Sequence, residues 1–514
     1  MRLLLTSFLA VAALAPAADW LTDGGSPQRT AWQKDEHTLS TANVKNLQIL
    51  WKLQLDNKSD QMHALFPPLI LDQLRTPSGV KQVAIVAGVS NNVFGIDVEA
   101  GTVLWKRHFD YPPPGNLRPN NDDPLCPEGL LATPTIGPPN AAGQRPVYAV
   151  AGDGQLHVLN AADGEELAPA VKFLGANSKA YSLNLFDNVL FTTTSQGCHG
   201  NPNQMWAMKV DDPTHKIMTA SPKSGGLWGR SGAAIDSQGV AWAPTGDGRY
   251  DKETQTYGNG LIGAKYDAGE IKIVDYFIPS NWSWLQKRDL DFQVTPAIFT
   301  YKGKELMVAA SKECRLYLLD TRNPGGEDHQ TPLDRTPLIC NEEVNFASAG
   351  IWGSLASWED AKGTRWVLTP IWGPVHPKFK SPVTNGMVTH GAVVAFKVED
   401  KNGKLQLTPA WISRDMDQAE PPLVANGVVY GFGSGENTVQ AYSDVGLRDS
   451  SKLRIANSTH AVLYALDAEN GKELYSSGDQ IKTWNHFEGL TLANGRVYLG
   501  TYDNVLYCFG LPGK

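Results

Sequence analysis

Two aspartates lie two positions apart in the segment DYFIPSNWSWLQKRDLDF (275–292), at Asp289 and Asp291. Side chains two residues apart on a strand point to the same face of a sheet, so these carboxylates could share one cation. The alternative is that they cap a loop or pair with the neighbouring Arg288. The sequence alone leaves both interpretations open.

Cys198 and His199 are adjacent in the glycine-containing segment TTTSQGCHGNPNQMWAMKVD (192–211). A thiolate beside an imidazole can bind a metal or act as an activated nucleophile. A single Cys-His pair in such a loop is more often structural. We therefore expect a structural role and keep the chemical one as the alternative.

The chain holds five cysteines, an odd number, so at least one is free or pairs with another molecule. Cys508 lies in the apolar segment NVLYCFG and is expected to be a buried hydrophobe. The other four could form up to two disulfides, for which we favour Cys126–Cys198 and Cys314–Cys340, although connectivity cannot be read from sequence. The chain has no C-x-x-C-H motif, so no covalently attached haem is indicated.

Three further loops carry residues that could line a binding site, because function often resides on loops. The default interpretation of each is ordinary solvated surface. The candidates are Asp122, Asp123 and Glu128 in 116–135, His376 and His390 in 369–391, and His486 and Glu488 in 484–490.

Composition and the first residues limit the class of protein. Of 514 residues, 42% are hydrophobic and 19% charged, which is typical of a globular protein with a large core. The net charge is −8 with scattered basic residues, which argues against a nucleic-acid partner or a membrane-surface patch. Residues 1–18 (MRLLLTSFLAVAALAPAA) are predicted to be a signal peptide cut after Ala17 or Ala18. Their apolar run is shorter than the ~20 residues that a membrane span needs, so we expect a periplasmic or secreted protein with no membrane span.

A short apolar strand followed by a turn recurs along the chain at intervals of roughly 40 to 75 residues, which is typical of a stacked or radial array. The copies are VFGIDVEAG (93–101), LHVLNAADG (156–164), MWAMKVDD (205–212), LIGAKYDAG (261–269), LYLLDTRNPGG (316–326), VVAFKVEDKNG (393–403), LYALDAENG (463–471) and LYCFG (506–510).

The repeat predicts an all-β, eight-bladed β-propeller of four-stranded antiparallel blades over residues 19–514. The last unit stops after its third strand at Gly510, and NLQILWKLQL (46–55) is expected to supply the fourth, so that the N-terminal strand closes the ring. In GIDVEAGTVLW (95–105), the Asp accepts bonds from the turn, the Gly supplies a positive φ, and the Trp packs between blades. A two-sheet sandwich is the alternative, but it does not explain the repeat.

The repeats resemble the A-x-D-x-x-T-G-x-x-x-W docking repeats of the quinoprotein (pyrroloquinoline-quinone, PQQ) alcohol dehydrogenase-like superfamily. The best copies, GIDVEAGTVLW and ALDAENGKELY, lack the Thr, and the second ends in Tyr. The opening DWLTDGGSPQRTAWQKDEHTLSTANVKNLQILW (19–51) is also similar to that family's N-terminus. The resemblance covers nearly the whole chain. It implies a central funnel in which PQQ lies on a tryptophan platform, beside a calcium ion held by Glu, Asn and Asp, with an Asp as base.

Matching segments carry these roles to individual residues. SGGLWGRSGAAID (224–236) implies Trp228 as platform and Arg230 as a cofactor contact. PTGDGRYDKETQTYGNGLIGAKYDAG (244–269) implies Asn259 as a metal ligand, and Asp289 and Asp291 would serve as base and metal ligands. The alternatives are an inter-blade Trp228 and a turn residue at Asn259.

The family's Glu ligand falls at Cys198, and a neutral thiol is a poor calcium ligand. The adjacent-cysteine disulfide of some members is also absent. The resemblance implies an exported PQQ-dependent oxidoreductase of an alcohol, polyol or sugar, with PQQ and calcium as cofactors and a separate electron acceptor. The alternative is a non-catalytic propeller scaffold that binds protein or saccharide partners in the cell envelope.

Overall fold

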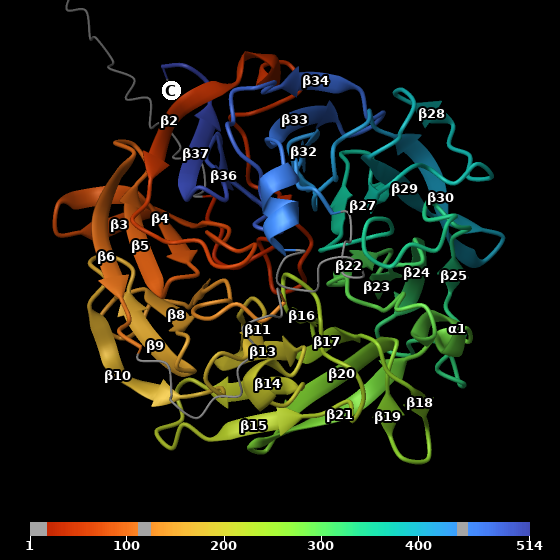
Figure 1. The fold of residues 1–514 in the computed structure, drawn as a ribbon, viewed down its shortest axis with the longest axis horizontal. Coiled ribbons are helices and arrows are strands. Elements are labelled where there is room, and N and C mark those ends of the chain that lie inside the picture. The colour runs from red at the N-terminus through yellow and green to blue at the C-terminus, as the bar shows by residue number, and fades with distance from the viewer. Residues whose placement is uncertain (1–17, 112–124, 439–450, 514) are drawn as a thin grey trace, which may run out of the picture.

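The described residues form eight sheets of four or five strands around a central axis (Figure 1). The structure is a computed structural model that describes residues 18–111, 125–438 and 451–513. Each of these sheets is a blade, and the blades are numbered in chain order. The predicted eight-bladed propeller is therefore confirmed, whereas residues 1–17 of the expected signal peptide, with Asp122 and Asp123, lie outside the described residues.

Blades 1 to 4 follow one another along the first half of the chain. Blade 1 contains β3 (Leu69–Thr76), β4 (Gly79–Gly88), β5 (Asn92–Asp97) and β6 (Thr102–His108). Blade 2 contains β7 (Thr135–Ile136), β8 (Pro146–Val150), β9 (Gln155–Asn160) and β10 (Glu166–Lys172). Blade 3 contains β11 (Lys179–Ala180), β12 (Asn184–Phe186), β13 (Val189–Ser195), β14 (Met205–Lys209) and β15 (Ile217–Ala220). Blade 4 contains β16 (Ala234–Ile235), β17 (Val240–Thr245), β20 (Gly260–Asp267) and β21 (Glu270–Phe277), with a hairpin of β18 (Tyr250–Asp251) and β19 (Thr256–Tyr257).

Blades 5 to 8 complete the ring, and the last two also take strands from the N-terminus. Blade 5 contains β22 (Ala297–Tyr301), β23 (Lys304–Ser311), β24 (Arg315–Asp320) and β25 (Asp334–Arg335). Blade 6 contains β26 (Ala356–Glu359), β27 (Arg365–Trp372), β28 (Val383–Thr384), β29 (Gly391–Lys401) and β30 (Lys404–Ile412). Blade 7 contains β1 (Trp32–Gln33), β31 (Leu423–Ala425), β32 (Val428–Gly433), β33 (Val462–Asp467) and β34 (Glu473–Ser476). Blade 8 contains β35 (Leu490–Ala493), β36 (Arg496–Gly500), β37 (Val505–Gly510) and β2 (Gln48–Gln54).

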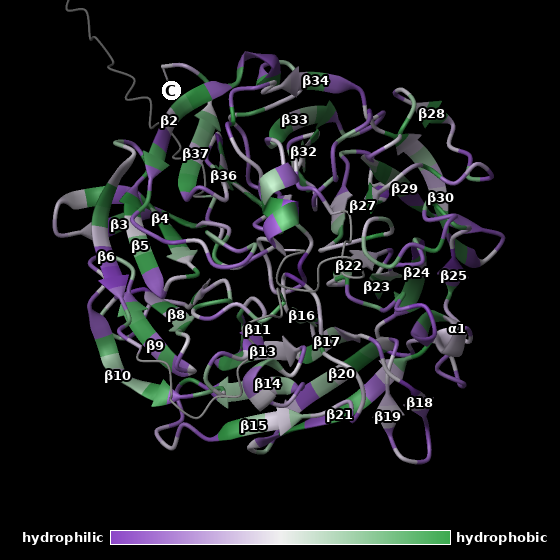
Figure 2. Cartoon of the chain, in the orientation of Figure 1, coloured by the Kyte–Doolittle hydropathy of each residue, from purple (hydrophilic) through white to green (hydrophobic). Residues whose placement is uncertain are grey.

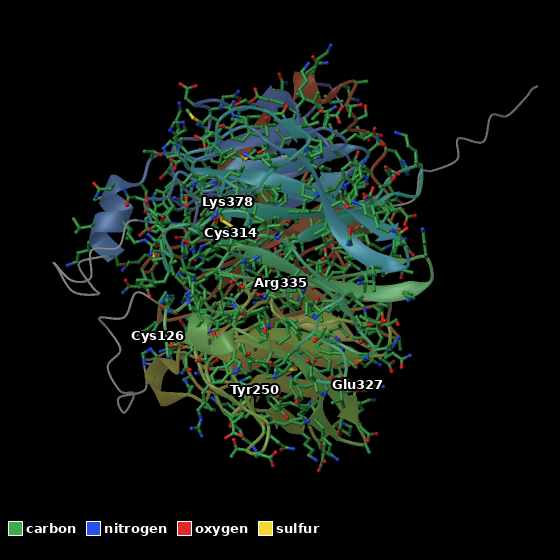
Figure 3. All side chains as sticks on the ribbon, turned by 90° about the vertical axis from the view of Figure 1, so that its right-hand side faces the viewer. Cys126, Tyr250, Cys314, Glu327, Arg335 and Lys378 are labelled. Carbon is green, nitrogen blue, oxygen red and sulfur yellow. A yellow bond between two sulfur atoms is a disulfide. The ribbon has the colours of Figure 1, made fainter. Side chains whose placement is uncertain are left out.

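Short helical elements connect some of these strands, namely η1 (Val44–Asn46), η2 (Cys198–Gly200), α1 (Trp282–Gln286) and the helical segment 451–457. That last segment lies over the hub in the view of Figure 1. In the side view of Figure 3, Cys126 lies toward the same end of the molecule as this segment. The loops at that end therefore surround one mouth of the central axis.

The first long strand closes the ring as expected. β2 pairs antiparallel with β37 from Gln48, opposite Gly510, to Gln54, opposite Val505, and Figure 1 shows the two strands side by side. The pairing gives blade 8 its outermost strand. No unpaired edge is left beside β37, which is where an open sheet would invite pairing with another chain.

The segment before β2 forms an N-terminal plug, which we define as residues 20–33 and which the sequence did not reveal. Its backbone carbonyls accept hydrogen bonds from the first strands of several blades, including 2.8 Å from Ile235 N to Pro27 O and 3.0 Å from Ile298 N to Gln28 O. β1 also pairs parallel with β31. The plug thus ties separate blades together around the axis.

The blades pack through a repeated tryptophan contact that explains the spacing of Asp, Gly and Trp. The indole of Trp105 lies against Gly164 of the next blade and donates to Ala161 O at 3.0 Å. Trp411 lies against Gly471 and donates to Ala468 O at 3.0 Å. The glycine has a positive φ in both turns, and a Cβ there would lie 2.5 Å or less from the ring. Glycine is therefore needed for the turn and for the contact.

The hydrophobic core lies between and within the blades. The residues of β5, β27 and β32 are all buried, whereas in the outer strand β6 only Trp105 is buried. Figure 2 shows hydrophobic residues along the strands and hydrophilic residues in many connections. Both favoured disulfides are confirmed, Cys126–Cys198 and Cys314–Cys340, and Cys508 is a free, buried cysteine as expected.

Candidate functional site

A cavity of about 370 Å³ lies where loops from several blades converge. Its wall includes Trp228, Arg230 and Asp289, three of the five residues implied by the resemblance. Glu488 and His486, which we had named as loop candidates, also line it. Glu128, His376 and His390 are not among the described residues of the wall.

The two aspartates share a cation, which is the ammonium group of Lys312. Lys312 Nζ lies 3.3 Å from Asp289 Oδ1 and 3.4 Å from Asp291 Oδ1. The prediction that both aspartates lie on a strand is wrong. Asp289 lies in the turn after α1 with φ 51°, and Asp291 also lies outside any strand. Arg288 does not pair with them but lies over the ring of Trp284, 4.9 Å from its centroid.

Burial and a like charge change the acidity of this pair. Burial, followed by the hydrogen bond and negative charge of Asp291, raises the pKa of Asp289 to about 7, although Lys312 acts in the opposite direction. Asp289 is the member that lines the cavity, and Asp291 is only 2% exposed. A carboxyl group at the cavity wall therefore changes its protonation near neutral pH.

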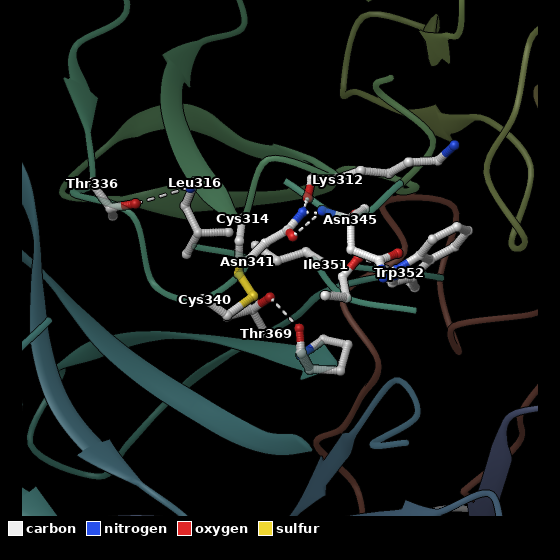
Figure 4. Close-up of a disulfide and its surroundings, with 12 residues drawn as sticks. Lys312, Cys314, Leu316, Thr336, Cys340, Asn341, Asn345, Ile351, Trp352 and Thr369 are labelled. Carbon is white, nitrogen blue, oxygen red and sulfur yellow. Dashed lines mark hydrogen bonds between the residues drawn. A yellow bond between two sulfur atoms is a disulfide. The ribbon is translucent and has the colours of Figure 1, made fainter. Parts of the chain in front are cut away.

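The backbone and a disulfide hold Lys312 in place. It lies in the turn between β23 and β24, and its N–H donates to Asp291 O at 3.0 Å. Asn341 donates to Lys312 O at 2.7 Å, as Figure 4 shows. Cys314 and Cys340, each close in sequence to one of these residues, are joined by the second disulfide. The bond thus fastens the turn that positions the ammonium group.

Trp228, Asn259 and Asp291 converge on Gly246. A Cβ at Gly246 would lie 2.2 Å from Trp228 Nε1 and 2.9 Å from Asp291 Oδ2, and Asn259 N donates to Gly246 O at 3.2 Å. Two buried polar atoms here lack a hydrogen-bond partner among the described residues, namely Trp228 Nε1 and Asn259 Oδ1. Such atoms are costly unless a ligand or water satisfies them.

Arg230 lines the cavity but is also a structural brace. It forms an ion pair with Asp23 of the plug at 3.1 Å. It also donates to Phe487 O and, at 3.1 Å, to Glu488 O. The guanidinium group therefore joins the plug to the loop that forms part of the cavity wall.

Aromatic rings pave another part of the wall. Trp352 stacks on Trp372 with centroids 4.9 Å apart, and Phe487 stacks on Trp372 at 5.4 Å. Lys312 Nζ lies 5.2 Å from the centroid of Trp352, within the range of a cation–π interaction. The sequence did not single out these three rings, because many tryptophans in the chain pack between blades instead.

The alternative in which the Cys198 thiolate binds a metal or acts as a nucleophile is wrong, because its sulfur is bonded to Cys126. His199 beside it is buried, and both of its ring nitrogens lack a partner among the described residues.

The described residues contain no group of three or more His, Cys, Asp and Glu side chains placed to hold a metal ion. In the part of the chain that the structure describes, no helix has the length and hydrophobicity to cross a membrane.

Comparisons with known proteins support the fold. No protein-family model matches the chain, and no curated protein sequence matches it. Among solved structures, a europium-containing methanol dehydrogenase superposes with a TM-score of 0.59 at 13% identity, over 96% of this chain and 98% of that one. The quinohemoprotein alcohol dehydrogenase of Comamonas testosteroni gives 0.55 at 13% identity, over 98% and 82%. The alcohol dehydrogenase ADHIIG of Pseudomonas putida HK5 gives 0.57 at 11%, over 97% and 81%. The chain therefore has the same overall fold as these dehydrogenases, which in this chain is the eight-bladed propeller described above.

Proposed function

We propose that the protein is an oxidoreductase that binds PQQ in the central cavity and oxidises an alcohol, polyol or sugar. The observation that carries this proposal is the cavity wall, which combines aromatic faces, cationic side chains and an aspartate with a pKa near 7. The fold of the similar solved structures supports it, but a fold alone does not fix an activity.

The wall suits a planar aromatic anion. PQQ is a flat quinone with three carboxylates, and Trp228 and Trp352 offer faces for stacking. Lys179 and Lys312 line the same cavity and would offer positive charge to those carboxylates. The unpartnered, buried Nε1 of Trp228 offers a hydrogen-bond donor as well.

The residues that would hold a calcium ion are Asn259 and Asp291, which leaves Asp289 to act as the base. Calcium binds oxygen ligands; Asn259 Oδ1 is a buried oxygen without a hydrogen-bond partner in the described structure, and Asp291 is a buried carboxylate. Both residues contact Gly246, so they belong to one neighbourhood. The family's Glu has no acidic counterpart at Cys198, so the remaining ligands would come from the cofactor and water.

The quinone, when bound, would supply the acceptor for the two electrons of the alcohol. Asp289 would take the proton of the substrate hydroxyl, because a base works best when its pKa lies near the working pH. Lys312 would hold Asp289 in position through their 3.3 Å contact. Electrons would then leave to a separate acceptor protein. We propose that the chain is exported through residues 1–18, which N-terminal sequencing of the mature protein would test.

The experiment is a titration of the purified protein with PQQ, with and without Ca²⁺, followed by dye-linked oxidation of ethanol, glycerol and glucose. Eu³⁺ is a third arm, because one similar structure contains europium. We expect micromolar binding and turnover, with Lys312→Met weakening both. The matched control is Lys378→Met, because Lys378 is exposed and does not line the cavity.

If micromolar PQQ does not bind without metal, with Ca²⁺ or with Eu³⁺, the proposal of a PQQ-dependent oxidoreductase is refuted. The non-catalytic scaffold would then be the better account. Binding without turnover of any substrate would refute the oxidation. Equal effects of the two lysine substitutions would refute the role of Lys312.

A further inference from the structure

Glu436, His486 and Arg454 form a buried polar cluster that the proposed oxidation does not use. The Glu436 side chain is 0% exposed, and its Oε2 lies 2.7 Å from His486 Nδ1. Arg454 pairs with the other oxygen, Oε1. The charge of Glu436 is therefore already balanced, while His486 and Arg454 both reach the cavity wall.

This contact sets the orientation of the His486 ring. Because the Glu436 carboxylate can only accept there, Nδ1 of His486 carries a hydrogen, and Nε2 is the nitrogen left for a ligand. Nε2 makes no hydrogen bond to the described residues, and His486 lines the cavity. The protein thus presents Nε2 of His486 in a fixed orientation to whatever enters.

His63 lies beside this ring. The two imidazole centroids are 5.3 Å apart, and His63 also lines the cavity. Its Nδ1 is buried and has no partner in the described structure. Burial, followed by the charges of His486 and Lys179, lowers the pKa of His63 well below its usual value, so the ring is neutral at pH 7. A neutral imidazole offers one donor and one acceptor.

Two imidazole rings side by side suit a hydroxyl group, which can donate to one ring and accept from the other. Phe487 lies next to His486, with centroids 4.7 Å apart, and stacks on Trp372. Such aromatic faces suit the C–H surface of a sugar or polyol. An alcohol with one hydroxyl, bound at Asp289, would leave these polar atoms unpaired, which costs affinity.

We propose that His486, oriented by Glu436, and His63 form a second hydroxyl-binding subsite, so that the substrate is a polyol or sugar. This inference rests on the proposed function, because Asp289 provides the first hydroxyl site. His486 and His63 bind the substrate here and transfer no proton, and Glu436 is the positioning residue.

The test compares kcat/KM for sorbitol and for ethanol in the PQQ-loaded protein. His486→Phe keeps the ring volume and leaves Glu436 paired with Arg454. We expect it to lower the sorbitol-to-ethanol ratio about tenfold, mainly through the KM for sorbitol, because one hydrogen bond is lost. His486→Gln, which keeps polar atoms, should restore part of the ratio. His37→Phe, at an exposed histidine, is the control.

A second readout does not need the cofactor. Calorimetry of the PQQ-free protein with sorbitol should show binding that His486→Phe weakens and His37→Phe does not. If PQQ fails to bind, the proposed function fails while sorbitol binding still tests the subsite. An unchanged substrate ratio in His486→Phe, or a wild-type preference for ethanol, overturns the subsite even if PQQ binds. Absence of sorbitol binding to the PQQ-free wild type also overturns it.

Discussion

The contact between Trp411 and Gly471 yields a prediction about how the blades hold together. Gly471 has φ 73°, and a Cβ there would lie 2.4 Å from Trp411 Cε3. Gly403 has a similar φ of 82°, but a Cβ there would meet nothing within 4 Å. The two glycines therefore separate the cost of backbone conformation from the cost of the inter-blade contact.

The magnitudes follow from these geometries. Gly403→Ala should lower the free energy of unfolding by about 1 to 2 kcal/mol, the cost of a left-handed non-glycine residue. Gly471→Ala should cost about 2 kcal/mol more, because the fully buried Trp411 must move. Trp411→Ala removes about 200 Å² of buried surface at about 25 cal/mol per Å², or about 5 kcal/mol, near the upper end of such substitutions.

The assay is urea unfolding of the two glycine variants, of Trp411→Ala, and of the double variant that combines Trp411→Ala with Gly471→Ala. Once Trp411 is gone, Gly471→Ala should cost no more than Gly403→Ala, which gives a coupling energy of about 2 kcal/mol. Equal costs for Gly471→Ala and Gly403→Ala in the otherwise unchanged protein would refute the argument. So would strictly additive effects in the double variant.

Three other predictions concern buried charge and the second disulfide. Proton abstraction needs ionised Asp289, so kcat/KM for the alcohol should rise as pH passes about 7. Asp291→Asn removes a like charge and should lower the midpoint of this rise by about one pH unit. An unchanged midpoint would contradict the assignment of Asp289 as the base. Burial raises the pKa of Glu420 well above 4.5, so the folded protein holds a proton that the unfolded chain releases. The free energy of unfolding should therefore fall above pH 4.5 by up to about 1.4 kcal/mol per pH unit. Glu420→Gln should reduce this slope between pH 5 and 8, as measured by urea titrations. An equal slope in both proteins would exclude this role of Glu420. Replacing Cys314 and Cys340, 26 positions apart, by serine should cost about 3 kcal/mol of unfolding free energy and weaken PQQ binding through Lys312; a calorimetric titration that shows unchanged affinity would separate the disulfide from the site.

The repeat made the architecture predictable. The turn at Gly101 and the strand that carries Trp105 have a local sequence signature, because a positive φ and a flat inter-blade ring each demand a particular residue type. The pairing of β2 with β37 followed from one missing strand in the last unit. The plug escaped detection because its backbone bonds to distant strands leave no periodic pattern in residues 20–33.

The site was only partly predictable. Asp289 and Trp228 were identified by resemblance, and both line the cavity. Lys312 was missed because its contact to the aspartates depends on the placement of blade 5 against the loop after α1, which no local motif encodes. The Glu436–His486 contact joins residues 50 positions apart, so the histidine loop alone could not reveal its partner.

The central claim is that the cavity holds the quinone. A crystal structure of the protein soaked with PQQ and Ca²⁺ tests it most directly. The account predicts electron density for the flat cofactor inside the cavity, against Trp228 and within reach of Lys312. Density for PQQ only on the outer surface of the propeller, or an empty cavity at saturating PQQ, would contradict this claim.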